Sequence, residues 1–206
     1  MKFDYVVALT GAGISAGSGI PTFEEHPEIK EVLNIRVLEE EPEKVEEALN
    51  TMRSCVEGKE PNDAHKALAE YKVPIITMNI DSLHQKAGSK EVIELHGNLK
   101  DNNVVLYGQP MNNAGKAWNM VNMVTNNARN CLLVVGTSLK TQFANELISD
   151  AMMKGYYIKR INENAETEVR KFLESIFEEE DDSVVDEQDN YNSDMPVVFL
   201  HRGHKS

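Results

Sequence analysis

Two closely spaced glycines with the spacing of a phosphate-binding turn follow the first apolar segment of the chain. Residues 3–10 are mostly apolar, and the run from Gly11 to Ala16 comes directly after them. This run matches the G-x-G-x-x-G/A pattern, in which missing side chains let backbone N–H groups approach a pyrophosphate. A plain tight turn fits the same glycines. The continuation from Gly17 to Phe23 favours ligand binding, because a Gly/Ser-rich run is costly to order without one.

A second polar cluster, from Thr77 to His84, follows another apolar segment. Asn79 offers an amide donor and acceptor, and Asp81 offers a carboxylate that only accepts hydrogen bonds. Together these two side chains are suited to hold a ribose or a carboxamide. An Asn/Asp turn with helix capping explains the same residues without a ligand.

A histidine follows the short apolar run 92–95 and precedes a glycine. The imidazole of His96 has an unperturbed pKa of about 6.5, which suits proton abstraction at neutral pH. We therefore interpret His96 as a candidate general base. The other histidines are interpreted as structural, and the spacing of the last two is only a weak indication of a metal; they are His26, His65, His84, His201 and His204.

Two further apolar segments end in polar residues. The run 131–135 leads into Gly136, Thr137 and Ser138, whose hydroxyls suit phosphate contacts, and the run 156–161 leads into Asn162 and Glu163, which suit a ribose. The carboxyl ends of parallel strands meet at one edge of a sheet, where open α/β folds bind their ligands. Five such ends are hard to explain by core packing alone and predict one binding site.

These clusters require an α/β architecture to position them. Apolar runs alternate with helical patterns, which predicts a Rossmann-like parallel sheet with helices on both faces. The expected strands are 3–10, 73–79, 92–95, 104–107, 131–135 and 156–161. The expected helices are 63–71, with Asp63 as its cap, 116–127, 143–154 and 165–177.

The chain divides into a body and a tail. We expect an NAD-binding type of domain over 1–177, with a small helical insertion at about 24–62, and an acidic linker and tail over 178–206. Nine acids and no Lys or Arg lie in 178–194, so they account for nine of the 13 net negative charges and leave −4 elsewhere. The segment 195–200 fits either a last strand or a docking hydrophobic tail.

Composition excludes several classes of protein. The two cysteines cannot build a disulfide framework or a four-thiolate zinc site, so we expect no bound metal. The nearly neutral body gives no reason to expect nucleic acid or anionic membranes as partners. No apolar run is long enough for a membrane span and no signal peptide is recognisable, so we expect a cytoplasmic protein.

Taken together, the motifs resemble those of the sirtuin family of NAD-dependent protein deacylases, in family order over about residues 5 to 175. The resemblance implies NAD as co-substrate, with an acyl-lysine protein or peptide as partner. It implies that His96 is the catalytic base, that Asn79 and Asp81 hold the nicotinamide, and that Phe23 shields the reactive ribose carbon. The implied cofactor-binding residues are Gly11, Ala12, Gly13, Ser15, Gly19, Ile20, Phe23, Asn79, Ile80, Asp81, Gly136, Thr137, Ser138, Asn162 and Glu163.

The chain departs from the family pattern near its substrate side. Glu24 stands where an arginine is usual, and only seven residues, 97–103, separate His96 from the next apolar run, where most sirtuins carry a zinc module. Three hypotheses follow: a zinc-free deacylase, an NAD hydrolase or ADP-ribosyltransferase on the same domain, and a non-catalytic NAD-binding module. The retained Asn79, Asp81 and His96 argue against the third.

Overall fold

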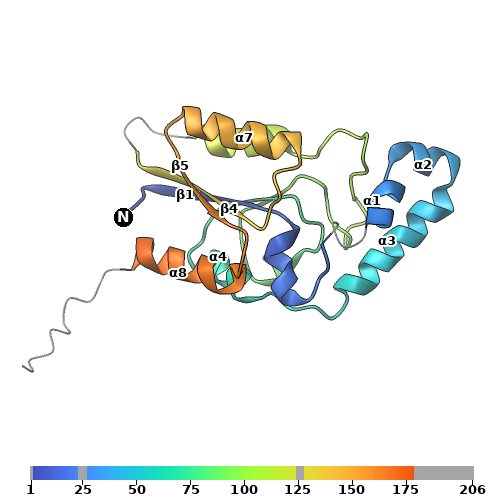
Figure 1. Cartoon of the computed structure of the whole chain (residues 1–206), viewed down its shortest axis with the longest axis horizontal. Helices are drawn as coiled ribbons and strands as arrows, with labels where there is room; N and C mark the ends of the chain where they lie inside the picture. Colours follow the sequence, from blue (N-terminus) through green and yellow to red (C-terminus); the bar gives the residue numbers. More distant parts are fainter. Residues whose placement is uncertain (1, 23–26, 124–127, 179–206) are drawn as a thin grey trace, which may run out of the picture.

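The computed structural model describes residues 2–22, 27–123 and 128–178. Its centre is a five-stranded, fully parallel sheet with the strand order β3-β2-β1-β4-β5 (Figure 1). The strands are β1 (Tyr5–Thr10), β2 (Ile75–Thr77), β3 (Val92–Glu94), β4 (Asn130–Val135) and β5 (Tyr157–Ile161). The predicted α/β fold with a Rossmann-like parallel sheet is therefore confirmed.

The central strands are buried because helices cover both faces of the sheet. Ala8 of β1 lies opposite Ile75 of β2 and Leu133 of β4, and all three are inaccessible to solvent. A strand covered on both faces has a continuous apolar sequence, which is why polar and apolar residues do not alternate along β1 and β4. Thr10 and Thr77 end neighbouring strands in register, so the segments that follow them start side by side.

Helices form two outer layers, one on each face of the sheet (Figure 1). One face is covered by α4 (Asp63–Glu70) and α8 (Ala165–Phe177), and the other by α6 (Ala114–Asn122) and α7 (Gln142–Met153). On α8 the buried residues Val169, Leu173 and Ile176 recur at three- to four-residue spacing, the apolar stripe of an amphipathic helix. No helix of the described residues is long and apolar enough to cross a membrane.

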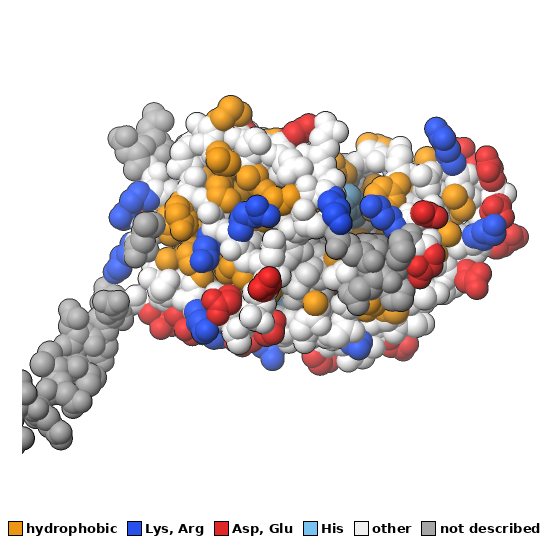
Figure 2. All heavy atoms as spheres, viewed as in Figure 1, with side chains coloured by type: hydrophobic (Ala, Val, Ile, Leu, Met, Phe, Trp, Pro, Cys, Tyr) orange, Lys and Arg blue, Asp and Glu red, His pale blue; other side chains and the backbone are white. Residues whose placement is uncertain are grey.

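The predicted helical insertion contains α1 (Pro27–Val32), α2 (Ile35–Glu40) and α3 (Pro42–Val56) at one end of the molecule (Figure 1). Pro42 occupies the first turn of α3, where its missing N–H costs no hydrogen bond. Leu33, Val45 and Ala48 of the insertion form a small separate core with Leu106 from outside it. Acidic side chains gather over the end formed by α2 and α3 (Figure 2).

Two local predictions were wrong. Residues 104–107 form no strand; only Tyr107 makes an isolated bridge, to Asn34, because this segment packs on the insertion and not on the sheet. The cap of α4 is Asn62, whose side chain accepts the N–H groups of Ala64 and His65, whereas Asp63 is the first helical residue and pairs with Arg170.

The glycine-rich turn opens a 3-10 helix, η1 (Ala12–Ser18). The expected acidic linker beyond residue 178, the segment 195–200 and the end of the predicted helix 116–127 lie outside the described residues.

Candidate functional site

The β1–η1 turn packs against the end of β4 so closely that side chains do not fit. Gly13 N–H donates to the carbonyl of Gly136 at 2.8 Å. A Cβ on Gly136 would lie 2.2 Å from the nitrogen of Ile14, and a Cβ on Gly13 would lie 2.7 Å from the Cα of Gly136. Gly11 is similarly close to Gly136 and Thr137. Backbone packing therefore explains these glycines directly, and it also joins two of the sequence-predicted clusters.

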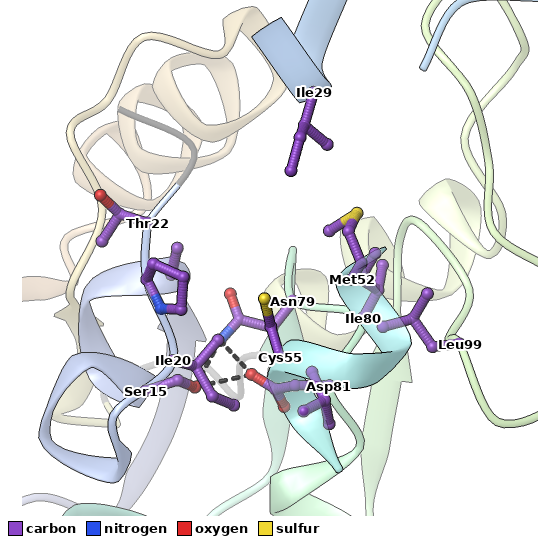
Figure 3. Close-up of a pocket in the computed structure, with 13 residues that line it drawn as sticks. Ser15, Ile20, Thr22, Ile29, Met52, Cys55, Asn79, Ile80, Asp81 and Leu99 are labelled. Atoms are coloured by element: carbon purple, nitrogen blue, oxygen red, sulfur yellow. Dashed lines mark hydrogen bonds between the residues drawn. The ribbon is translucent and has the colours of Figure 1, made fainter. Parts of the chain in front are cut away.

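The end of β2 places Asn79 and Asp81 against Ser15 of η1. The Ser15 hydroxyl donates to Asp81 Oδ2 at 2.7 Å, and the Asn79 amide donates to Ser15 Oγ at 3.1 Å and to Asp81 Oδ2 at 3.2 Å. The other Asp81 oxygen, Oδ1, accepts the N–H of Leu83 at 2.9 Å. Figure 3 shows the three side chains meeting at one end of a cavity. The structure thus brings together residues 64 positions apart in the sequence.

Two histidines that sequence reasoning interpreted as structural lie buried directly beneath this cluster. His65 Nε2 is 3.4 Å from Ser15 Oγ, and His84 Nε2 is 2.9 Å from Thr10 Oγ1. Burial lowers the pKa of His65 to about 4, a shift that the nearby Asp81 carboxylate opposes. Burial and the neighbouring His65 lower the pKa of His84 to about 3. Both imidazoles are therefore neutral at neutral pH.

The cavity above the cluster lies between η1, the end of β2 and the helical insertion. Six predicted cofactor residues line it: Ala12, Ser15, Ile20, Asn79, Ile80 and Asp81. Its opposite wall is apolar: Ile29 and Met52 come from the insertion, and Leu99 comes from the segment after β3 (Figure 3). Pro21, Thr22, Cys55 and Val56 complete the lining.

Sequence reasoning missed the apolar wall. The signal was present in α3, where Val45, Leu49, Met52 and Val56 continue one stripe at three- to four-residue spacing. The first members pack in the core of the insertion, and the last two reach the cavity.

His96 follows β3, one strand away from Asn79. The N–H of Leu95 donates to the carbonyl of Thr77 at 3.0 Å, which holds the ends of β3 and β2 side by side. Burial lowers the pKa of the half-buried His96 imidazole. His96 does not line the cavity that contains Asn79 and Asp81. The structure thus places it at the same sheet edge, with its role as a base still a prediction.

The remaining predicted residues follow β4 and β5 at that edge. Thr137 is buried and its hydroxyl accepts the N–H of Leu139, whereas Ser138 is exposed. Asn162 and Glu163 are exposed after β5, whose Ile161 carbonyl accepts the N–H of Gly136 at 2.9 Å.

Gly19 ends η1 with a φ of 73°, a conformation that favours glycine. Phe23 and Glu24 lie outside the described residues.

The cysteines have separate environments. Cys131 is buried within β4, where burial raises the pKa of its thiol to about 12, and Cys55 lies at the cavity wall. Across the described ranges, no three side chains among His, Cys, Asp and Glu come together in a way that could hold a metal ion.

Comparisons with known proteins agree with this arrangement. The model of the Sir2 family matches residues 11–103, the stretch that contains the glycine-rich turn, Asn79, Asp81 and His96. The NAD-dependent protein deacylase of Aggregatibacter actinomycetemcomitans is 33% identical over 186 residues, covering 70% of this chain and 86% of that protein. The chain belongs to the Sir2, or sirtuin, family.

Other sirtuins match a shorter stretch. NAD-dependent protein deacetylase 2 of Caldanaerobacter subterraneus is 41% identical over 115 residues, which cover 50% of this chain and 46% of that protein. The chain thus spans less than half the length of several curated relatives. Among solved structures, the complex of a Sir2 homologue with NAD superposes with a TM-score of 0.74 at 27% identity, covering 84% of this chain and 89% of that one.

Proposed function

We propose that this sirtuin is an NAD-dependent protein lysine deacylase, which transfers the acyl group to ADP-ribose and releases nicotinamide. The observation that carries the proposal is the cavity in which Ser15, Asn79 and Asp81 meet beside an apolar wall. The names of the sirtuins from Aggregatibacter and Caldanaerobacter, a deacylase and a deacetylase, point to the same reaction.

The chemistry of the cavity fits the nicotinamide end of NAD. A pyridine carboxamide needs hydrogen-bonding groups for its amide and an apolar surface for its ring, and a cavity with few placed polar groups supplies both. We propose that Asn79 and Asp81 hold the amide and that Ile20 and Ile80 pack on the ring. When bound, NAD supplies a ribosyl C–N bond whose cleavage leaves a cationic ribose carbon, and the Asp81 carboxylate favours such a charge.

We propose that the rest of the sheet edge holds the other parts of NAD. The groups proposed for the pyrophosphate are the glycine-rich turn with Gly11, Ala12, Gly13 and Gly19, and the β4 end with Gly136, Thr137 and Ser138. Asn162 and Glu163 are proposed to contact the adenosine ribose, and Phe23 to shield the reactive carbon from water.

We propose His96 as the catalytic base. An imidazole must be neutral to accept a proton, and burial favours the neutral form by lowering the pKa of His96. Its place after β3, beside the end of β2, puts it at the edge where the ribose would lie.

We also propose that this sirtuin works without a zinc module. Two observations support this: the chain has only two cysteines, and only seven residues separate His96 from Val104. The short 97–103 segment favours one alternative, an NAD hydrolase or ADP-ribosyltransferase in which water or another nucleophile replaces acyl-lysine. We further propose that the NAD-binding domain ends at residue 177, that an acidic linker and tail follow it, and that the protein is cytoplasmic.

Product analysis separates these activities. The protein is incubated with NAD, with and without an acetyl-lysine peptide, and the products are identified by mass spectrometry. Peptide-dependent acyl-ADP-ribose supports the deacylase. ADP-ribose formed equally without peptide supports the hydrolase, and unchanged NAD despite measurable binding contradicts both.

Variants test the assignment of the base. We expect His96→Ala to reduce peptide-dependent turnover by about 10² to 10⁴, the range of general-base catalysis. His204→Ala, outside the proposed machinery, is the matched control and should retain turnover. Undiminished activity of His96→Ala would remove His96 from this role.

A further inference from the structure

We propose that His84 is a positioning residue that fixes Asn79 through a chain of two threonine hydroxyls, with its imidazole proton held on Nε2. We call His84, Thr10 and Thr77 the relay. None of these three residues lines the cavity, so the relay would act from beneath it. Its catalytic consequence rests on the proposed function, whereas its geometry does not.

The relay joins three elements that the sheet places side by side. His84 Nε2, on α5 (Leu83–Lys86), lies 2.9 Å from Thr10 Oγ1 at the end of β1. Thr10 Oγ1 lies 2.9 Å from Thr77 Oγ1 at the end of β2, and Thr77 Oγ1 accepts the backbone N–H of Asn79 at 3.0 Å. All three side chains of the relay are at most 2% exposed.

The Thr10 hydroxyl donates to Thr77 Oγ1, and this hydrogen bond sets the direction of the relay. Thr77 Oγ1 accepts from Asn79 N–H and from the Thr10 hydroxyl. A hydroxyl has one proton to donate, so Thr10, having donated to Thr77, must accept from His84. The proton of the neutral imidazole therefore belongs on Nε2.

The other ring nitrogen supports the same assignment. Nδ1 of His84 is buried and has no hydrogen-bond partner among the described residues. Burying an N–H without a hydrogen-bond partner costs free energy, so we expect Nδ1 to be the ring nitrogen that carries no proton. The His65 ring, with its centroid 4.9 Å away, also disfavours a charged His84.

The relay ends at a residue of the cavity. Because the backbone N–H of Asn79 is fixed by Thr77, its side-chain amide is held where it donates to Ser15 and Asp81. Breaking the relay should therefore affect binding at the nicotinamide end of the cavity more than binding at the ends of β4 and β5.

Nitrogen-15 NMR of the full chain at neutral pH tests the tautomer directly, with His84→Gln used to assign the signals. We expect the His84 ring to show a protonated Nε2 and a bare Nδ1. A proton on Nδ1, or an average of the two tautomers, would overturn the relay whether or not the protein is a deacylase.

Substitutions test the effect on Asn79. Thr77→Val removes the acceptor and keeps the shape, whereas Thr77→Ser keeps the hydroxyl. We expect Thr77→Val to weaken inhibition by nicotinamide about tenfold, the effect of one lost hydrogen bond, and Thr77→Ser to stay near wild type. Isothermal titration with NAD gives a second readout that needs no turnover.

A general loss of stability is controlled by Leu173→Ala, a core substitution in α8 away from the cavity. At a matched melting temperature it should leave nicotinamide inhibition unchanged. If Leu173→Ala and Thr77→Val weaken inhibition equally, or if Thr77→Val leaves both inhibition and NAD binding unchanged, the positioning role is wrong. An inactive wild-type protein would contradict the proposed function and leave the NMR and titration tests decisive for the relay.

Discussion

The two ends of the cavity are built by different means. The polar end, formed by Ser15, Asn79 and Asp81, is tied by hydrogen bonds of defined direction to the ends of two strands. The apolar wall, to which Ile29 and Met52 belong, is formed largely by a helical insertion and is held by packing. Directional bonds fail when one atom is changed, whereas dispersion contacts are individually weak and tolerate change. The polar end should therefore be far more sensitive to substitution than the wall.

The largest expected effect is at Asp81. In Asp81→Asn an amide replaces the carboxylate that accepts both Ser15 and Asn79, so donors face donors and the negative charge is lost. We expect NAD turnover to fall by about 10² to 10³, the effect of removing one stabilising group from an active site. Steady-state kinetics measure it. Asp4→Asn, at the opposite edge of the sheet, is the control and should retain turnover; a similar loss there would contradict the assignment.

The backbone contact between η1 and the end of β4 should be the most sensitive point for stability. Gly136→Ala places a Cβ against the backbone of Ile14 at a φ of 61°. We expect a loss of about 3 kcal/mol or more in the free energy of unfolding, measured by urea denaturation. Gly155→Ala has a similar positive φ but nothing within 4 Å, so it separates conformational strain from the clash. Equal losses in the two variants would show that close packing is not the cause.

The buried histidines make the polar end sensitive to acid. The folded-state pKa values of His65 and His84, about 4 and about 3, lie below the unfolded value, so the unfolded chain binds more protons below about pH 6.5. Their contribution is fully present above that pH and is lost as the pH falls. We expect each to reduce the free energy of unfolding by about 2 kcal/mol between pH 6.5 and pH 5.

Urea denaturation at the two pH values measures this loss, with His84→Gln as the comparison. That variant should show a weaker pH dependence, because it lacks one of the two titrating groups. An unchanged slope would mean that His84 is not buried neutral.

The smallest effect is expected at the wall. Met52→Ala removes part of an apolar surface that other side chains still cover, and a half-buried methionine contributes modestly. We expect the KM for NAD to rise by about threefold or less, consistent with about 1 kcal/mol of lost contact. A loss of turnover comparable to that of Asp81→Asn would show that the wall acts as more than a packing surface.

The same contrast explains what the sequence could predict. The polar end was predictable because each member follows an apolar run within a few residues, and parallel strands bring their carboxyl ends together. Asn79 and Asp81 were identified on that basis, whereas Ser15 was implied by the family resemblance. The apolar stripe of α3 was visible in the sequence, but no local pattern specifies how α1 and α3 dock to turn its last members into a cavity wall. His65 and His84 were interpreted as structural histidines, and both are buried. Their hydrogen bonds to Ser15 and Thr10 could not be predicted, because they depend on tertiary contacts.

The position of β1 in the sheet has a consequence for synthesis on the ribosome. Tyr5 pairs with Asn130, 125 positions later, so the strand of this sheet that is synthesised first becomes its middle strand. One of its edges has no native partner until β4 emerges. Nascent chains that stop before residue 130 should therefore be sensitive to protease and bind chaperones, because contacts this distant must wait for their partner.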